Sequence, residues 1–248
     1  MGRPFSDITL YIPTRYSNDT PEYRAEAFLH NYISDLYVTK MNGYKPSGAT
    51  RVCIQPAYYG IWDQTWKNGS IFLIAPEFVR EKYETLDRYE KYRYILDIIQ
   101  WSMLQLSDEY NWDRSVFEKA YQDTINCNFE FSMSLPGKKS RDRRKLGNIC
   151  IEKTETTTFA YAIIQTDSSK LKIKLFEKIN SYWYDCVYLL AKNAKWKDTD
   201  KFGISYKKGL IDIYYSISEE KVFLFQSGAE VSEIDFYKFR FDYNYLSR

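Results

Sequence analysis

The amino-acid sequence predicts an α+β protein, with an N-terminal part that mixes helices and strands and a C-terminal antiparallel β-meander. From Val79 to Tyr110, apolar residues recur every three or four positions, which is the period of a long amphipathic helix. After Cys127 the period changes to two, which is typical of half-buried strands. The connections between these later strands are short and carry no helical period, which favours antiparallel neighbours.

The change of period divides the chain into two expected parts, residues 1–126 and 127–248. A chain of 248 residues with 44% hydrophobic residues is long enough to bury a sizeable core. No tract rich in Pro, Gly or Ser separates the parts, so we expect them to pack together as one globular unit.

The first expected elements are a strand and a helix. Residues 7–12 alternate apolar and polar side chains, and Pro13 ends this strand. Thr20 is a suitable N-cap for a helix that has Pro21 in its first turn. The apolar stripe of this helix comprises Phe28, Tyr32 and Leu36.

Further strands are expected after this helix, two of them joined as a hairpin. The sequences RVCIQ (51–55) and YYGIWDQTW (58–66) are predicted strands. Asn68 and Gly69 lie between the second of these and IFLI (71–74), and the Asn-Gly pair predicts a type I′ turn.

The long periodic stretch that starts near Val79 is expected to form one helix or two collinear helices. Ile95 and Ile98 widen its apolar stripe, which places its second half deepest in the core. Asp113 is the expected N-cap of a further helix.

Strands are expected throughout the second part of the chain. Residues 129–135 alternate apolar and polar side chains, and residues 170–175 place lysines at every second position. The sequences DIYYSI (212–217) and KVFLF (221–225) continue the pattern, and a helical period returns only in VSEIDFYKF (231–239).

Positive charge is concentrated in residues 138–145. The whole chain has 35 basic and 33 acidic residues, whereas without this stretch the counts are 29 and 32. A diffuse polyanion-binding surface is therefore not expected. The basic residues of the stretch are Lys138, Lys139, Arg141, Arg143, Arg144 and Lys145.

This basic stretch is expected to be a mobile connection of about a dozen residues between two strands, because its charged composition cannot pack. It would serve as a solvated loop, as a contact for an acidic protein surface or as a contact for nucleic-acid phosphates. The acidic protein is favoured over nucleic acid, because the stretch contains no aromatic residue and the rest of the chain is net negative.

A second candidate binding surface is aromatic. Trp62 and Trp66 are four residues apart in a predicted strand, so their side chains are expected on the same face. Core packing is one interpretation of this pair. If the face is open, it would stack against a carbohydrate, a small molecule or a partner's side chains.

Histidine-dependent catalysis and metal binding are not expected, because His30 is the one histidine of the chain. Catalytic triads and zinc sites need imidazoles that converge with other ligands, and His30 is predicted to be a solvated residue on the polar face of its helix. The four Cys residues are far apart in the sequence and are expected to be reduced. We therefore expect no metal and no cofactor.

A carboxylate-only active site stays open as an alternative. Acidic residues are numerous, and pairs such as Glu77 with Asp97, or Glu130 with Asp212, would be needed for acid–base work. The glycines at Gly43 and Gly48 have the spacing of a phosphate-binding loop, but the lysine of that motif is missing, so a turn is expected there.

The sequence favours a soluble binding protein without catalytic machinery, confined to the cytoplasm and with no membrane contact, since no apolar run has the length of a signal peptide. An immunity-type inhibitor that neutralises a bacterial toxin fits this class by analogy. The alternatives are a nucleic-acid-binding protein or carboxylate-dependent nuclease that uses residues 138–145, and a carbohydrate- or small-molecule-binding domain on the aromatic strand face. The sequence gives no indication of oligomeric state.

Overall fold

The computed structural model describes residues 7–16, 20–56, 65–180 and 187–236. They divide into two compact units, with the change from one unit to the other between Glu130 and Phe131. We call the described residues up to Glu130 unit 1 and those from Phe131 onward unit 2. Helices and antiparallel strands are both abundant, so the predicted α+β class is confirmed.

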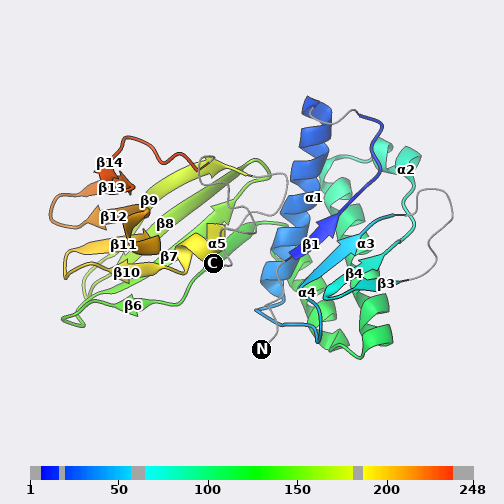
Figure 1. Ribbon diagram of the computed structural model, residues 1–248, viewed down its shortest axis with the longest axis horizontal. Helices are drawn as coiled ribbons and strands as arrows, with labels where there is room; N and C mark the ends of the chain where they lie inside the picture. The colour runs from blue at the N-terminus through cyan, green and yellow to red at the C-terminus, as the bar shows by residue number, and fades with distance from the viewer. Residues whose placement is uncertain (1–6, 17–19, 57–64, 181–186, 237–248) are drawn as a thin grey trace. The chain divides into compact units, whose positions relative to one another are not determined.

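Unit 1 contains a four-stranded mixed sheet (Figure 1). The strands β1, β2 and β4 are parallel to one another, and β3 pairs antiparallel with β4. The helix between β1 and β2 supplies the crossover that parallel neighbours require. The sheet order is β1 (Asp7–Leu10), β2 (Arg51–Ile54), β4 (Ile71–Ile74) and β3 (Trp66–Asn68).

Two of the helices of unit 1 begin at the caps that the sequence predicts. Thr20 accepts a hydrogen bond from the backbone N–H of Tyr23, and Asp113 accepts one from Ser115. Asp87 and Glu90 form a reciprocal capping box that separates the predicted long helix into two. The helices are α1 (Pro21–Lys40), α2 (Arg80–Thr85), α3 (Arg88–Tyr110) and α4 (Arg114–Asn126).

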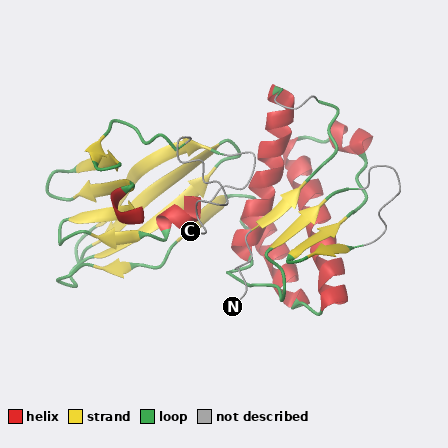
Figure 2. Ribbon diagram, in the orientation of Figure 1, coloured by secondary structure: helices red, strands yellow, loops and turns green. Residues whose placement is uncertain are grey.

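The core of unit 1 lies between the sheet and the helices, which Figure 2 shows on one face of it. The register aligns Ile8, Val52 and Phe72 across three strands, and all three are buried. α1, α3 and α4 pack against one another. Alternate strand residues such as Ile71 and Trp66 therefore project from the opposite face of the sheet.

Unit 2 consists of two antiparallel sheets and the short helix α5 (Val187–Ala191). Neighbouring strands in sequence are mostly neighbours in the sheets, as a meander requires. The first sheet contains β5 (Phe131–Ser134), β6 (Lys138–Lys139), β7 (Leu146–Lys153), β8 (Thr157–Gln165) and β9 (Lys170–Ile179). The second contains β10 (Ala194–Trp196), β11 (Lys201–Tyr206), β12 (Ile211–Ser216), β13 (Lys221–Gln226) and β14 (Ala229–Glu230).

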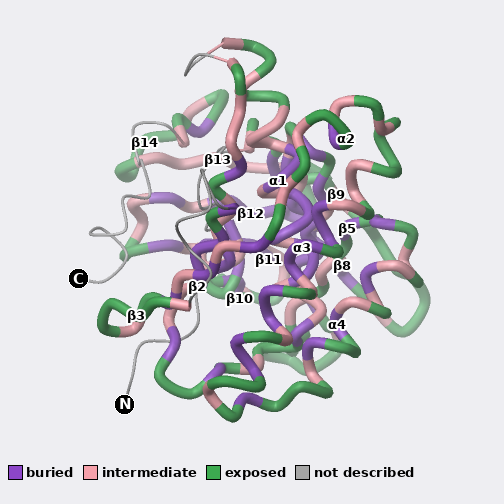
Figure 3. The backbone as a smooth tube through the Cα atoms, turned by 90° about the vertical axis from the view of Figure 1, so that its right-hand side faces the viewer, coloured by how far each residue is buried: buried purple, intermediate pink, exposed green. Residues whose placement is uncertain are grey.

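The two sheets of unit 2 enclose an apolar core. Ile149 and Ile151 of β7 and Phe202 and Ile204 of β11 are all buried, and the buried residues of β11 and β12 are purple in Figure 3. Gly147 lies directly against the Phe202 ring, because a Cβ at this position would be 2.6 Å from the ring. A larger residue at position 147 would therefore force the Phe202 ring to move.

Two local predictions were wrong. The hairpin between β3 and β4 exists, but Asn68 pairs with Ile71, so Gly69 and Ser70 form the turn. Gly69 has a φ of 60° at the first central position, which is the place of glycine in a type II′ turn. Residues 231–236, the described part of VSEIDFYKF, contain no helix.

Candidate functional site

The basic stretch is an ordered hairpin in unit 2. Lys138 and Lys139 form β6, which pairs with Gly147 and Leu146 of β7. The prediction of a structureless connection of about a dozen residues was therefore wrong, since the pairing shortens the turn to residues 140–145. We call residues 138–145 the basic hairpin.

Short-range hydrogen bonds fix the turn of the basic hairpin. The backbone N–H of Ser140 donates to the carbonyl of Lys145 at 2.9 Å, and the N–H of Lys145 donates to Ser140 Oγ at 3.0 Å. Ser140 Oγ donates to Asp142 Oδ1 at 2.6 Å, and the N–H of Arg144 donates to the same oxygen at 3.2 Å. The turn also holds Arg143 at a φ of 61°, a conformation uncommon for a residue with a Cβ.

Asp142 has a structural role in this turn. The hydrogen bond from Ser140 lowers the pKa of its carboxyl group, and the hydrogen bond from the backbone of Arg144 acts in the same direction. Asp142 therefore stays ionised at neutral pH and accepts both bonds. It organises the surrounding cationic side chains, although it removes one positive charge from their sum.

The cationic side chains of the basic hairpin are exposed, with one exception. Among the residues that the structure describes, none forms an ion pair with the exposed Lys138, Lys139, Arg141, Arg143 or Arg144. The exception, Lys145, is half-buried, and its Nζ donates to the carbonyl of Thr199 at 2.6 Å.

The base of the basic hairpin is anchored to the second sheet of unit 2. Trp196 Nε1 donates to the carbonyl of Lys138 at 2.7 Å, and the Trp196 ring packs against Phe202, with 5.0 Å between the centroids. Sequence reasoning missed Trp196, because the contact joins residues 58 positions apart. The hairpin is thus presented from a fixed base.

Many other lysines of unit 2 already have a carboxylate partner. Their Nζ atoms lie 2.6 to 3.8 Å from a carboxylate oxygen. Accessible positive charge without a carboxylate partner is therefore most concentrated at the basic hairpin. The pairs are Lys172 with Glu152, Lys174 with Glu177, Lys197 with Asp212, Lys201 with Glu219, and Lys221 with Glu230.

The two parts of the chain differ in net charge. Residues 1–130 contain 14 basic and 18 acidic side chains, and residues 131–248 contain the other 21 of the 35 basic and 15 of the 33 acidic ones. The C-terminal part is thus positive and the N-terminal part negative. Long-range electrostatic attraction of an anionic partner is expected to favour the part that carries the basic hairpin.

The aromatic candidates lie elsewhere. Trp62 falls outside the described residues. Trp66 is 53% exposed in β3 and pairs with Leu73, on the sheet face opposite the helices. Because Trp66 belongs to unit 1 and the basic hairpin to unit 2, the two candidate surfaces are separate features of the fold.

A surface hollow of about 570 Å³ in unit 2 was not predicted. Its lining includes Lys197, Asp212 and Phe225. Lys197 Nζ lies 3.2 Å from the carboxylate of Asp212 and 4.0 Å from the centre of the Tyr214 ring. The alternating pattern of β12 and β13 indicates which of their residues share a face. Nothing in the sequence, however, indicates that the turn carrying Lys197 lies beside that face.

His30 is buried, so the prediction of a solvated surface histidine was wrong. It is 5% exposed, and its Nε2 lies 3.2 Å from the hydroxyl of Tyr83. Tyr83 comes from α2, which covers the helix face that the sequence pattern assigned to solvent. Burial lowers the pKa of His30 from 6.5 to about 3, and the charge of Arg80 acts in the same direction.

We expect the stability of the protein to fall as the pH drops below 6.5, in part because of His30. The unfolded chain binds a proton there below pH 6.5, whereas the folded chain does not until about pH 3. Between about pH 8 and pH 5, this single group should remove about 2 kcal/mol of unfolding free energy. Urea denaturation of the wild type and of His30→Gln at both pH values measures the difference.

Each protein is compared with itself at the two pH values, so any difference in baseline stability between His30→Gln and the wild type cancels. Carboxylates titrate in both proteins, and their contribution also cancels. Equal pH dependence in the two proteins would contradict the burial of a neutral imidazole.

Two of the candidate carboxylates are engaged by other side chains within their own units. Asp97 accepts hydrogen bonds from Arg93 and Tyr121, and Asp212 is paired with Lys197. Within the described ranges, no three His, Cys, Asp or Glu side chains gather in a way that could hold a metal ion. Glycines 43 and 48 lie in turns, where both have positive φ.

The fold and the site define an α+β chain that displays an ordered cationic hairpin. Comparison of the chain with family models, with curated proteins and with solved structures gives no match. Among the helices of the described residues, none combines the length and apolar character needed to cross a membrane.

Proposed function

We propose that this protein is a non-catalytic binding module that recognises an acidic protein surface through the basic hairpin. The observation that carries the proposal is the group of five exposed cationic side chains without an ion pair to a described residue, on a turn whose backbone is fixed. A preorganised turn loses little conformational entropy when it binds, so more of its contact energy contributes to affinity.

Localised charge favours a protein partner over nucleic acid. A nucleic acid presents an extended row of phosphates and rewards cations that are spread along a surface. Here the lysines beyond the basic hairpin include five that are already paired with carboxylates in unit 2. A compact cationic tip instead complements a compact acidic patch, in which Arg side chains form bidentate hydrogen bonds with carboxylates.

An inhibitor that covers the working surface of another protein is the form of this function that we favour. An immunity-type protein that neutralises a toxin in the bacterial cytoplasm needs an anchored recognition element and no catalytic group. The anchoring of the basic hairpin by Trp196 and Lys145 supports such a rigid contact.

Reversing three charges should abolish recognition without unfolding the protein. We expect Arg141→Glu, Arg143→Glu and Arg144→Glu together to weaken partner binding at least about tenfold, mainly through slower association. The melting temperature should change by no more than about 2 °C, because exposed side chains without ion pairs contribute little to stability. Capture of partners from a lysate of the native organism, followed by binding kinetics, measures both effects.

The matched control reverses three exposed lysines elsewhere in unit 2, namely Lys192, Lys207 and Lys208. It makes the same change in net charge, so it should retain binding if the hairpin is the recognition element. A nucleic-acid partner would instead be identified if nuclease digestion removed the captured material. The slope of log affinity against log salt concentration should then be smaller by about three in the triple variant. Unchanged capture by the triple variant would exclude the basic hairpin.

A further inference from the structure

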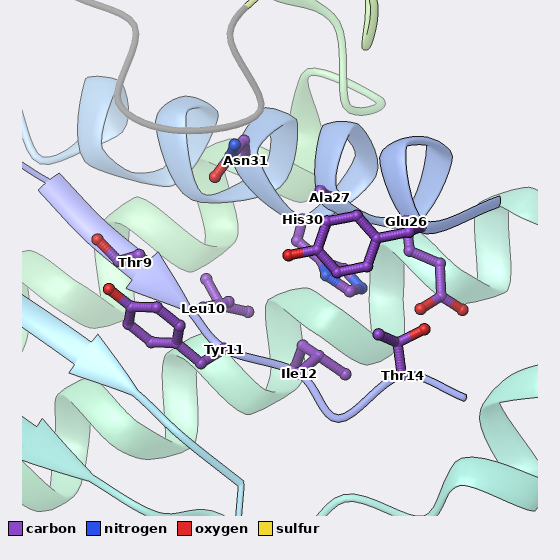
Figure 4. A pocket seen from close by; sticks show the side chains of 10 residues that line it. Thr9, Leu10, Tyr11, Ile12, Thr14, Glu26, Ala27, His30 and Asn31 are labelled. Carbon is purple, nitrogen blue, oxygen red and sulfur yellow. The ribbon is translucent and has the colours of Figure 1, made fainter. Parts of the chain in front are cut away.

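Unit 1 contains a partly open cavity of about 150 Å³ that the basic hairpin does not explain. It lies at the carboxyl end of β1, beside the first half of α1. Figure 4 shows Glu26 and His30 pointing from α1 toward the segment that carries Tyr11 and Thr14. In open α/β sheets, the carboxyl ends of parallel strands are the common place for ligand sites.

His30 gives this cavity a directional hydrogen-bonding group. Its Nε2 is engaged by the hydroxyl of Tyr83 at 3.2 Å, which fixes the orientation of the ring. Its Nδ1 makes no hydrogen bond with a residue that the structure describes. Because His30 lines the cavity, a ring nitrogen that is not engaged by the protein is suited to form a hydrogen bond with a ligand atom.

The charges around the cavity cancel. Glu26 and Arg80 form a two-point ion pair, with N–O distances of 2.7 and 3.3 Å. Glu84 lies 3.9 Å from Arg80 and also pairs with Arg15. The carboxylate of Glu26, which lines the cavity, is therefore neutralised by Arg80 close to the His30 imidazole. An ionic ligand would lose its hydration without gaining a counter-charge, so the cavity favours an uncharged molecule.

The size and walls of the cavity restrict the ligand further. A cavity of this volume can hold a benzene-sized molecule. Tyr11, Tyr23 and His30 contribute three flat rings to the lining, and Ala27 leaves space between them. Flat rings stack well on other flat rings.

We propose that this cavity is a binding site for a small, uncharged, planar molecule with one hydrogen-bonding group, which His30 Nδ1 recognises. The site uses residues of unit 1 alone. The proposal for this site is therefore independent of the function proposed for the basic hairpin.

Phenol is a suitable probe, and the single histidine of the chain is a built-in reporter. In the intact protein labelled with ¹⁵N, titration with phenol should shift the His30 ring nitrogen signals until they saturate. Intermolecular nuclear Overhauser effects should connect phenol protons to the His30 ring. Benzoate has the same ring with a negative charge and should bind at least tenfold more weakly.

A variant that fills the cavity provides the decisive comparison. Ala27→Leu should reduce phenol affinity at least tenfold, whereas Ala25→Leu, the same change at an exposed position of α1, should not. The Overhauser effects in the wild type keep the test valid even if Ala27→Leu fails to fold. The proposal is overturned if phenol produces no saturable shift of His30, or if a folded Ala27→Leu variant binds phenol as the wild type does.

Discussion

Gly203→Ala is expected to destabilise unit 2 by about 3 kcal/mol or more. Gly203 of β11 pairs with Tyr214 of β12. A Cβ at this position would overlap the carbonyl oxygen of Ile213 and lie 2.5 Å from the Cα of Tyr214. Both neighbours are backbone atoms, so no side-chain rotation can relieve the overlap and the two strands must separate. Urea denaturation followed by circular dichroism measures the loss.

Gly228→Ala is the matched control for this prediction. Gly228 has a φ of 84°, and a Cβ there would meet nothing within 4 Å. Only the backbone conformation opposes the alanine, so the cost should be about 1 kcal/mol. Equal losses for the two variants would show that β11 and β12 do not approach as closely as the structure indicates.

Leu96→Ala should lower the free energy of unfolding by about 2 to 5 kcal/mol, and Ile99→Ala should do the same. Leu96 and Ile99 are both 0% exposed in the middle of α3. Truncating either side chain leaves a cavity between α3 and its neighbours, because close-packed surroundings relax only partly. Thermal and denaturant melts of the intact protein provide the values.

Trp101→Ala tests the same helix at a surface position. Trp101 is 47% exposed, so its truncation should cost clearly less than that of Leu96, despite the larger side chain. A neutral Leu96→Ala together with a severe Trp101→Ala would mean that the buried and exposed faces of α3 are assigned the wrong way round.

Local signals predicted the helix starts well. Thr20, Pro21 and Asp113 act through backbone groups only a few residues away, so their effect is visible in the sequence. The parallel pairing of β1 with β2 was not predicted, because it joins Ile8 to Val52 across a whole helix. Alternation shows that a strand has two faces, but not which strand lies beside it.

The candidate site was predicted in composition but not in conformation. The six cationic residues of the basic hairpin are evident from the sequence. The fixed conformation of the hairpin, however, depends on the hydrogen bonds of Ser140 and Asp142, which the sequence analysis overlooked. His30 was misplaced for a different reason. The apolar stripe correctly identified one buried face of α1, but α2 covers a second face through Tyr83, a contact across 53 residues.

The position of β9 bears on edge-to-edge pairing between copies of the protein. Among the strands of the described residues, β9 is the last in its sheet, and its ten residues, Lys170–Ile179, form a long edge strand. Lys170, Lys172 and Lys174 are exposed at alternate positions along this edge. Lys172 and Lys174 are paired with Glu152 and Glu177, so two copies that met edge to edge would crowd the ammonium groups and disturb these ion pairs. We therefore expect the lysine alternation in β9 to disfavour edge-to-edge pairing of two copies.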